Sequence, residues 1–167
     1  QPCAEWPDPA QAPGNDSVRL RAVRVKTETG HVTDVIDIRK PMRIEIEYDI
    51  LKPGQMIVAQ FGFNTEEDVI AFIVNDRDPV WYRRPRAVGR YISTAWIPGN
   101  FLSEGTMVVG GGLFSEDPWH EHCDVPRVVG FRVVDPGTGD TARGDVTGRW
   151  EGAIRPLLKW TTDHAPF

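Results

Sequence analysis

From Val18 onward the chain is a succession of short runs in which apolar and polar residues alternate. The clearest run covers residues 42–50, MRIEIEYDI, in which every second residue is apolar and the residues between are charged. A period of two predicts a β-strand with one buried face and one face in water. Residues 18–25, VRLRAVRV, have the same texture, but the alternation slips near Ala22, which indicates a β-bulge.

Further strands are predicted wherever apolar runs lie between turn residues. The runs cover 56–65, 69–74 as the hairpin partner of 56–65, 88–97, 106–114 and 127–134, with shorter candidates at 32–36 and 154–158. Lys52-Pro53-Gly54, Pro98-Gly99-Asn100 and the polar segment SEDPWHEHCD separate them. Strands that recur about every ten residues with turns between them are typical of an antiparallel β-sandwich. The sequence lacks βαβ spacing, which disfavours a doubly wound α/β fold.

The amino-acid composition is consistent with this fold and excludes some other classes of protein. The chain has 167 residues, 40% of them hydrophobic, with 16 Gly, 14 Pro and a net charge of -5. This length suits one domain with a real core, and the spread of prolines excludes a bundle of long helices. The acidic balance disfavours a nucleic-acid partner, because phosphate binding relies on clustered Lys and Arg.

The chain divides into a lead segment, a domain and a tail. Residues 1–17 are Pro-rich and lack periodicity, so we interpret them as a linker or arm. Residues 18–160 form the expected sandwich domain, and 161–167 the C-terminal tail. We expect no transmembrane helix or signal peptide, because the sequence has no long apolar run and no basic segment followed by an apolar one. Because it begins with Gln1, we expect either a mature processed chain or a fragment cut from something larger. Nothing forces Cys3 and Cys123 to pair, which favours a reducing compartment.

Catalytic and metal signatures are weak. His120 and His122 would face the same side of a strand, but no second ligand cluster matches them and we predict no metal. The sequence has no nucleophile elbow and no phosphate-binding loop. We therefore expect neither a catalytic residue nor a cofactor in this chain.

Aromatic residues beside polar turns are more informative. Trp81 and Tyr82 precede an arginine cluster, and Trp119 lies between Pro118 and His120. Exposed rings flanked by hydrogen-bonding groups suit the C–H faces and hydroxyls of pyranose sugars. Most of the tryptophans at 6, 96, 150 and 160 are expected to fill core or interface space instead.

Small residues and amides mark a second part of this hypothesis. Gly110 to Gly112 interrupt a predicted strand, which implies a bulge, tight packing or a surface kept shallow for a ligand. Gln60 and Asn64 share a strand face with Gly62. The candidate carbohydrate-binding residues are therefore Gln60, Asn64, Trp81, Tyr82, Tyr91, Trp119, His120 and His122.

Three longer segments carry a family resemblance. They are Gly89 to Ser115, which contains IPGNFL, Val128 to Asp135, and Ala142 to Trp160, which contains RGD and RPLLKW. Together with the lead segment, they resemble the C-terminal domain of Wzt-type ATP-binding subunits of ABC transporters that export O-antigen and related surface polysaccharides.

The resemblance implies an immunoglobulin-like (jelly-roll-like) β-sandwich that binds the exported glycan without catalysis. It implies a homodimer in which the C-terminal strand, here Ile154 to Leu158, is exchanged between protomers. The partners would be the O-antigen or a related polysaccharide and the ATPase and membrane subunits of the transporter. The location would be cytoplasmic, at the inner face of the inner membrane. The parent subunit would be an ATPase whose nucleotide-binding domain is absent from this chain.

The resemblance supplies no transferable set of sugar-contacting residues, so the candidate site depends on the residues alone. The alternative function is a dimerisation or assembly module of the transporter ATPase subunit without its own glycan specificity.

Overall fold

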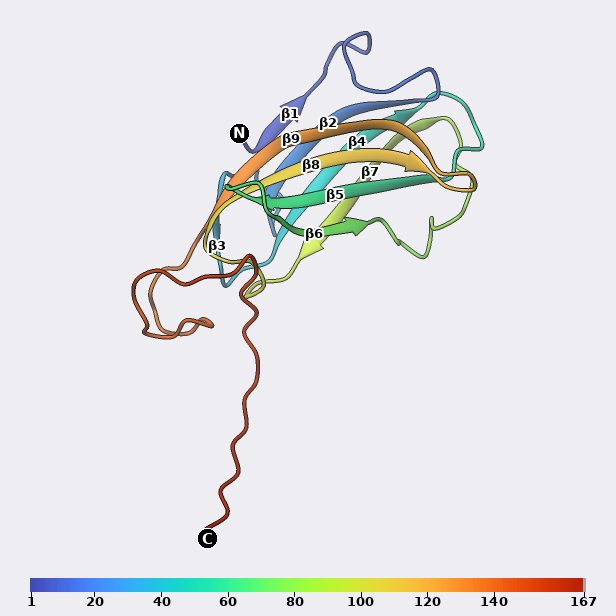
Figure 1. Ribbon diagram of the computed structural model, residues 1–167. Helices are drawn as coiled ribbons and strands as arrows, with labels where there is room; N and C mark the ends of the chain where they lie inside the picture. The colour runs from blue at the N-terminus through green and yellow to red at the C-terminus, as the bar shows by residue number, and fades with distance from the viewer. Residues whose placement is uncertain (167) are drawn as a thin grey trace.

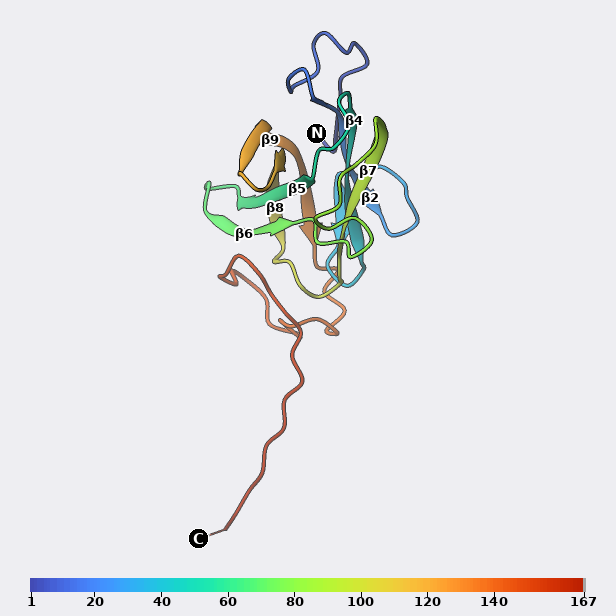
Figure 2. The ribbon, with the colours of Figure 1, turned by 90° about the vertical axis from the view of Figure 1, so that its right-hand side faces the viewer.

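Two β-sheets pack face to face in the computed structural model, which describes residues 1–166 (Figures 1 and 2). The first sheet has the order β1-β2-β4-β7 and the second β3-β9-β8-β5-β6. The strands are β1 (Cys3–Glu5), β2 (Val18–Thr27), β3 (Val35–Asp37), β4 (Met42–Ile50), β5 (Ile57–Thr65), β6 (Ile70–Asn75), β7 (Gly89–Ile97), β8 (Gly105–Ser115) and β9 (His120–Val134). The expected all-β sandwich is confirmed.

The strands predicted from alternation are present. β4 has the predicted bounds, and the bulge expected near Ala22 lies between Leu20 and Ala22. β5 and β6 form the expected hairpin. The period of two is therefore a sufficient signal wherever one face of a strand is buried and the other is wet.

The structure differs from the prediction at three places. β9 begins at His120, so part of the polar segment expected to connect two strands pairs with β8 instead. The polar residues at the start of β9 can pair with β8 because one face of this hairpin is exposed to water. β3 pairs with β9 in parallel, an exception to the antiparallel arrangement. Residues 154–158 form no strand within the described chain, where Ile154 makes only an isolated bridge to Leu102.

The lead segment, expected as a linker or arm, contains a short strand. β1 pairs with β2, with Cys3 opposite Arg24. Its side chains follow no clear alternation, so periodicity gave no signal for it. Cys3 and Cys123 are free thiols, and burial raises the pKa of Cys123 to about 11.

The core lies between the sheets. Ile44, Ile46 and Tyr48 of β4 are fully buried, and Phe63 and Leu113 face them from the second sheet. Burying a large apolar side chain stabilises a fold by about 1.5–3 kcal/mol. Gly111 faces inward where an added Cβ would contact Val23 and Ile46, and β8 has a bulge beside it. At Gly112 an added Cβ would lie 2.5 Å from the ring of Phe114 and 3.3 Å from the carbonyl of Cys123, so two of the interpretations offered for the glycine run, a bulge and tight packing, hold.

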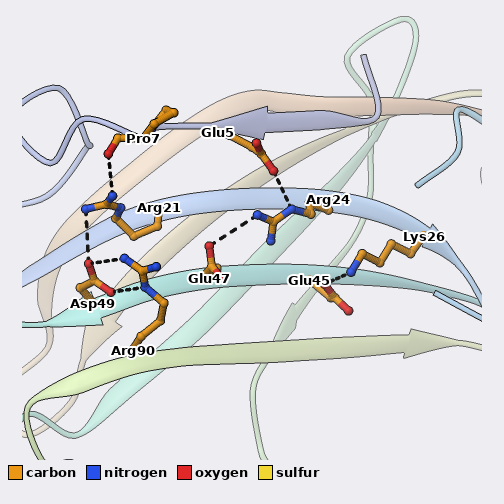
Figure 3. A network of polar contacts seen from close by, with 9 residues as sticks. All are labelled: Glu5, Pro7, Arg21, Arg24, Lys26, Glu45, Glu47, Asp49 and Arg90. Atoms are coloured by element: carbon orange, nitrogen blue, oxygen red, sulfur yellow. Dashed lines mark hydrogen bonds and ion pairs between the residues drawn. The ribbon is translucent and has the colours of Figure 1, made fainter. Parts of the chain in front are cut away.

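The outer face of the first sheet is a ladder of opposite charges (Figure 3). Asp49 lies 2.8 Å from Arg90 and 3.4 Å from Arg21, and Glu45 lies 2.6 Å from Lys26. Because the charged residues of β2, β4 and β7 neutralise one another across strands, this face offers few free charges to a ligand.

The chain after β9 packs against one end of the sandwich before it departs. Glu104 forms ion pairs with Arg143 at 2.6 Å and with the buried Arg155 at 3.1 Å. Beyond Leu157 the described chain extends away from the sandwich, and Trp160 is 85% exposed (Figure 1). No helix within residues 1–166 is long and apolar enough to cross a membrane.

Replacing Ile46 by alanine tests the location of the core. Ile46→Ala should lower the free energy of unfolding by about 2–5 kcal/mol, because it leaves a cavity between the sheets. The matched variant Ile73→Ala, at an exposed position of β6, should change it by less than about 0.5 kcal/mol. Urea denaturation measures both, and equal losses would contradict the packing described.

Candidate functional site

A groove runs along the edge of the sandwich where β6 and β7 end the two sheets. Its larger part is a cavity of about 360 Å³ bounded by β5, β7 and the start of the 76–88 loop. A second hollow of about 220 Å³ adjoins it and shares residues on the loop and β7. We call the two together the edge groove. Its principal side chains are those of Phe61, Asp76, Arg77, Asp78, Trp81, Tyr91, Ser93, Thr94, Ala95 and Trp96.

The register of β7 creates the opening. Tyr91 pairs with Tyr48 on β4, so Tyr91, Ser93 and Ala95 lie on the side of the sheet that faces the second sheet. Ser93 and Ala95 are small, which leaves space at the mouth of the sandwich. The side chain of Trp96 belongs to the opposite side, where the central carbon of the Arg43 guanidinium lies 5.0 Å from the centre of its ring, but the residue also lines both hollows of the groove. It is 59% exposed.

A buried arginine fixes the wall of the groove that the loop forms. Arg86 is 3% exposed. Its Nη1 donates to the hydroxyl of Tyr48 in the first sheet, and its Nη2 donates to the carbonyl of Ile57 in the second, at 3.3 Å. Asp76 lies 3.8 Å away. The guanidinium therefore connects both sheets to the loop.

Three aromatic rings surround this guanidinium. Its central carbon lies 5.4 Å from the ring centre of Trp81, 5.5 Å from that of Tyr91 and 5.9 Å from that of Tyr48. Trp81 and Tyr91 also meet edge to face at 5.5 Å. Burial raises the pKa of Tyr48, which keeps its hydroxyl protonated. Trp81 therefore stands in a fixed orientation, although it belongs to a loop.

Carboxylates and a guanidinium supply the polar lining. Asp76 Oδ1 accepts from the Asp78 N–H at 2.9 Å, and Asp78 Oδ1 accepts from the Val80 N–H at 3.0 Å. Each carboxylate thus uses one oxygen to hold the loop. Arg77 lies 3.4 Å from Glu116 and 4.8 Å from the centre of the Tyr82 ring. Rings, carboxylates and hydroxyls around one hollow are suited to a polyhydroxylated ring.

Several of the candidates named from the sequence meet at this groove. Trp81 and Tyr91 line it. Tyr82 lies beside it, between Arg77 and Arg83. Gln60 points to the outer face of the second sheet, where its amide donates to Asn75 at 2.7 Å, and Asn75 lines the groove.

The other candidates lie elsewhere. Asn64 is near the far end of β5, opposite Val108. Trp119 and His120 belong to the β8–β9 hairpin, where Trp119 stacks on Phe114 at 4.8 Å. Glu116 links this hairpin to the loop, through Arg77 at 3.4 Å and Arg83 at 3.7 Å. A role for these residues in binding stays a prediction.

Sequence reasoning missed eight of the ten principal groove residues, among them one tryptophan and three charged residues. Trp96 was grouped with residues expected in the core, and Asp76, Arg77 and Asp78 were not singled out. The signal that was available is the run NDRDP, which places charged residues immediately after a strand and just before Trp81.

His122 connects the lead segment to the β8–β9 hairpin. Asn15 Oδ1 accepts from the N–H groups of Ser17 and Val18, which orients the amide so that Nδ2 faces His122 Nδ1 at 2.9 Å. Nδ1 must therefore be the acceptor, and Nε2–H donates to Ser115 Oγ at 3.0 Å. Burial, reinforced by His120, lowers the pKa of His122.

The histidines do not build a metal centre with their neighbours. The rings of His120 and His122 lie 4.8 Å apart, edge to face. Within residues 1–166, no three His, Cys, Asp or Glu side chains converge in a way that could hold a metal ion.

Comparison with known proteins supports the architecture. No protein-family model matches the chain, and no curated protein matches it. Among solved structures, the chain is similar to a crystal structure of the C-terminal domain of Wzt, with a TM-score of 0.67 and 8% sequence identity. The match covers 90% of this chain and 86% of that one. At this identity the likeness shows the fold, and it agrees with the fold that the sequence resemblance implied.

The contacts of His122 predict acid sensitivity. Because its pKa is lower in the folded than in the unfolded chain, the unfolded chain binds more protons as the pH falls through about 6.5. Stability should therefore be full above that pH and decrease below it. Urea midpoints between pH 7.5 and 5 should fall less steeply in His122→Gln than in the parent chain. The variant His31→Gln, at an exposed histidine, serves as control, and an unchanged slope in His122→Gln would refute the assignment.

Proposed function

We propose that this chain is a carbohydrate-binding domain that recognises a surface polysaccharide, such as an O-antigen, at the edge groove. The observation that carries the proposal is the convergence of Trp81, Tyr91 and Trp96 with Asp76 and Asp78 around one hollow. The sequence resemblance supports the biological setting, and the likeness to the C-terminal domain of Wzt supports the fold on which the resemblance depends.

The groove would bind sugar in two ways. The exposed ring of Trp96 offers a flat apolar surface to the C–H face of a pyranose. Asp76, Asp78 and Thr94 offer partners to hydroxyl groups. Each hydroxyl gives up a hydrogen bond to water, so the net gain per contact is small and binding at one groove is weak. Two grooves in a dimer would raise the effective affinity through multivalency.

The proposal places the domain on a polysaccharide exporter. Its partners would be the ATPase and membrane subunits of an ABC transporter, at the cytoplasmic face of the inner membrane. The domain would hold the glycan without breaking a bond in it. These statements derive from the sequence resemblance.

An assembly module is the second candidate, and the C-terminal segment favours it. Leu157, Leu158 and Trp160 are exposed apolar residues on a segment that leaves the sandwich in an extended form (Figure 1). An extended apolar segment suits pairing with the edge of another sheet. Strand exchange between two copies would provide that edge. The two candidates are compatible, because the groove and the segment are different parts of the chain.

Removal of one aromatic ring tests the groove. Trp96→Ala should weaken binding of the source organism's surface polysaccharide by about tenfold or more, since a stacked aromatic contact and its buried area are lost. Trp119→Ala is the matched control, because Trp119 is similarly exposed but lies on the hairpin. Isothermal titration or NMR titration, with dextran as an unrelated glycan, measures the difference. Loss of binding in Trp119→Ala alone would move the site to the hairpin.

Truncation tests the assembly role. A chain that ends at Pro156 keeps Arg155 and its contact with Glu104 but lacks the extended segment. It should be monomeric by analytical ultracentrifugation and should still bind glycan through the groove, whereas the full chain should be a dimer. The point variant Leu158→Asp, made in the full chain, should also be monomeric. A full chain that sediments as a monomer would refute strand exchange.

A further inference from the structure

The charges that border the edge groove have consequences for which sugars it accepts. Asp76 and Asp78 line both of its hollows. Among residues 1–166, no Lys, Arg or His side chain forms an ion pair with Asp78, whose Oδ1 accepts only from the Val80 N–H of its own loop. A carboxylate accepts hydrogen bonds and donates none, so it is suited to sugar hydroxyls.

The two arginines beside the carboxylates do not offset this negative charge for a ligand. Arg77 forms an ion pair with Glu116 and lies over the ring of Tyr82. Arg86 is enclosed by three aromatic rings, and its Nη groups are directed at Tyr48 and Ile57. Its Nε is buried and has no hydrogen-bond partner within the described residues. Arg77 is half-exposed but already paired with Glu116, and the buried Arg86 pairs with Asp76, so the charge in the groove without a partner among the described residues is that of Asp78.

We infer that the edge groove selects uncharged sugar units and excludes acidic ones. This inference rests on the proposed function, because it names the class of glycan that the same groove would take. A uronic acid or phosphate-bearing unit would place its negative charge beside Asp78, in a hollow walled by Trp81, Tyr91 and Trp96. The larger hollow, which Asp78 also lines, has a mainly apolar lining, and this reduces the screening by water and so strengthens the repulsion. The net charge of -5 on the chain acts in the same direction.

A matched pair of probes tests the inference. The first probe is the source organism's surface polysaccharide, and the second is the same polysaccharide after selective oxidation of its primary hydroxyls to carboxylates. The unmodified probe should bind about tenfold more tightly than the oxidised one at 20 mM salt. The ratio should shrink at 500 mM salt, because salt screens the repulsion between charges.

Substitution at Asp78 separates charge from shape. Asp78→Asn keeps an acceptor oxygen but removes the charge, so it should reduce the preference for the unmodified probe several-fold. Glu67→Gln removes an equal charge before β6, at the other end of that strand from Asp78, and should leave the preference unchanged. The inference is overturned if neither high salt nor Asp78→Asn reduces the discrimination against the oxidised probe. The weaker binding of that probe would then come from the lost hydroxyl and not from its charge.

Failure of the inference differs from failure of the proposed function. If both probes bind with equal affinity, or if sugar analysis finds an acidic unit in the bound part of the natural polysaccharide, the groove binds glycan but lacks the charge selectivity. If neither probe nor any fragment of the natural polysaccharide binds to the full chain, the proposed function itself is refuted, and the inference with it.

Discussion

The buried guanidinium of Arg86 is the contact on which the edge of this sandwich depends. It reaches Tyr48 in the first sheet and Ile57 in the second, and its backbone pairs with Gln55. A buried cation is costly unless its donors and its charge are satisfied. Here two Nη hydrogen bonds, a nearby carboxylate and three aromatic rings compensate part of that cost, while Nε has no partner within the described residues. The same contacts hold the loop in place.

The groove follows from that contact together with the free edge of β7. The described chain adds no strand beyond β7, so the side chains of Ser93 and Ala95 border an opening rather than a sealed core. Arg86 holds Trp81 against Tyr91 on one side of the opening. Trp96 completes the border from the outer face of the sheet. These contacts distinguish Trp81 from an ordinary loop residue, because loops in general make few contacts with the core of a fold.

The sequence predicted the architecture better than the site. Alternation in residues 42–50 located β4, because that strand is buried on one face only. It missed β1 and the first part of β9, where pairing occurs without a clear buried face. For the site, an aromatic beside polar turn residues led to Trp81, but nothing local could show that Trp96 lies beside it. That proximity depends on which strand ends each sheet, a property of the whole topology.

One wall of the groove is formed by a single loop, residues 76–88. This arrangement bears on how the ligand preference of such a domain could change. This short segment contributes Asp76, Arg77, Asp78 and Trp81, while β7 contributes Tyr91 and Trp96 and β5 supplies part of the floor. It is anchored near its ends, where Asp76 bonds to Ala59 and Arg86 to Gln55. The residues between these two anchors can therefore change while Asp76 and Arg86 keep their backbone contacts. A new ligand preference would then require replacing one loop, with no change to the hydrophobic core.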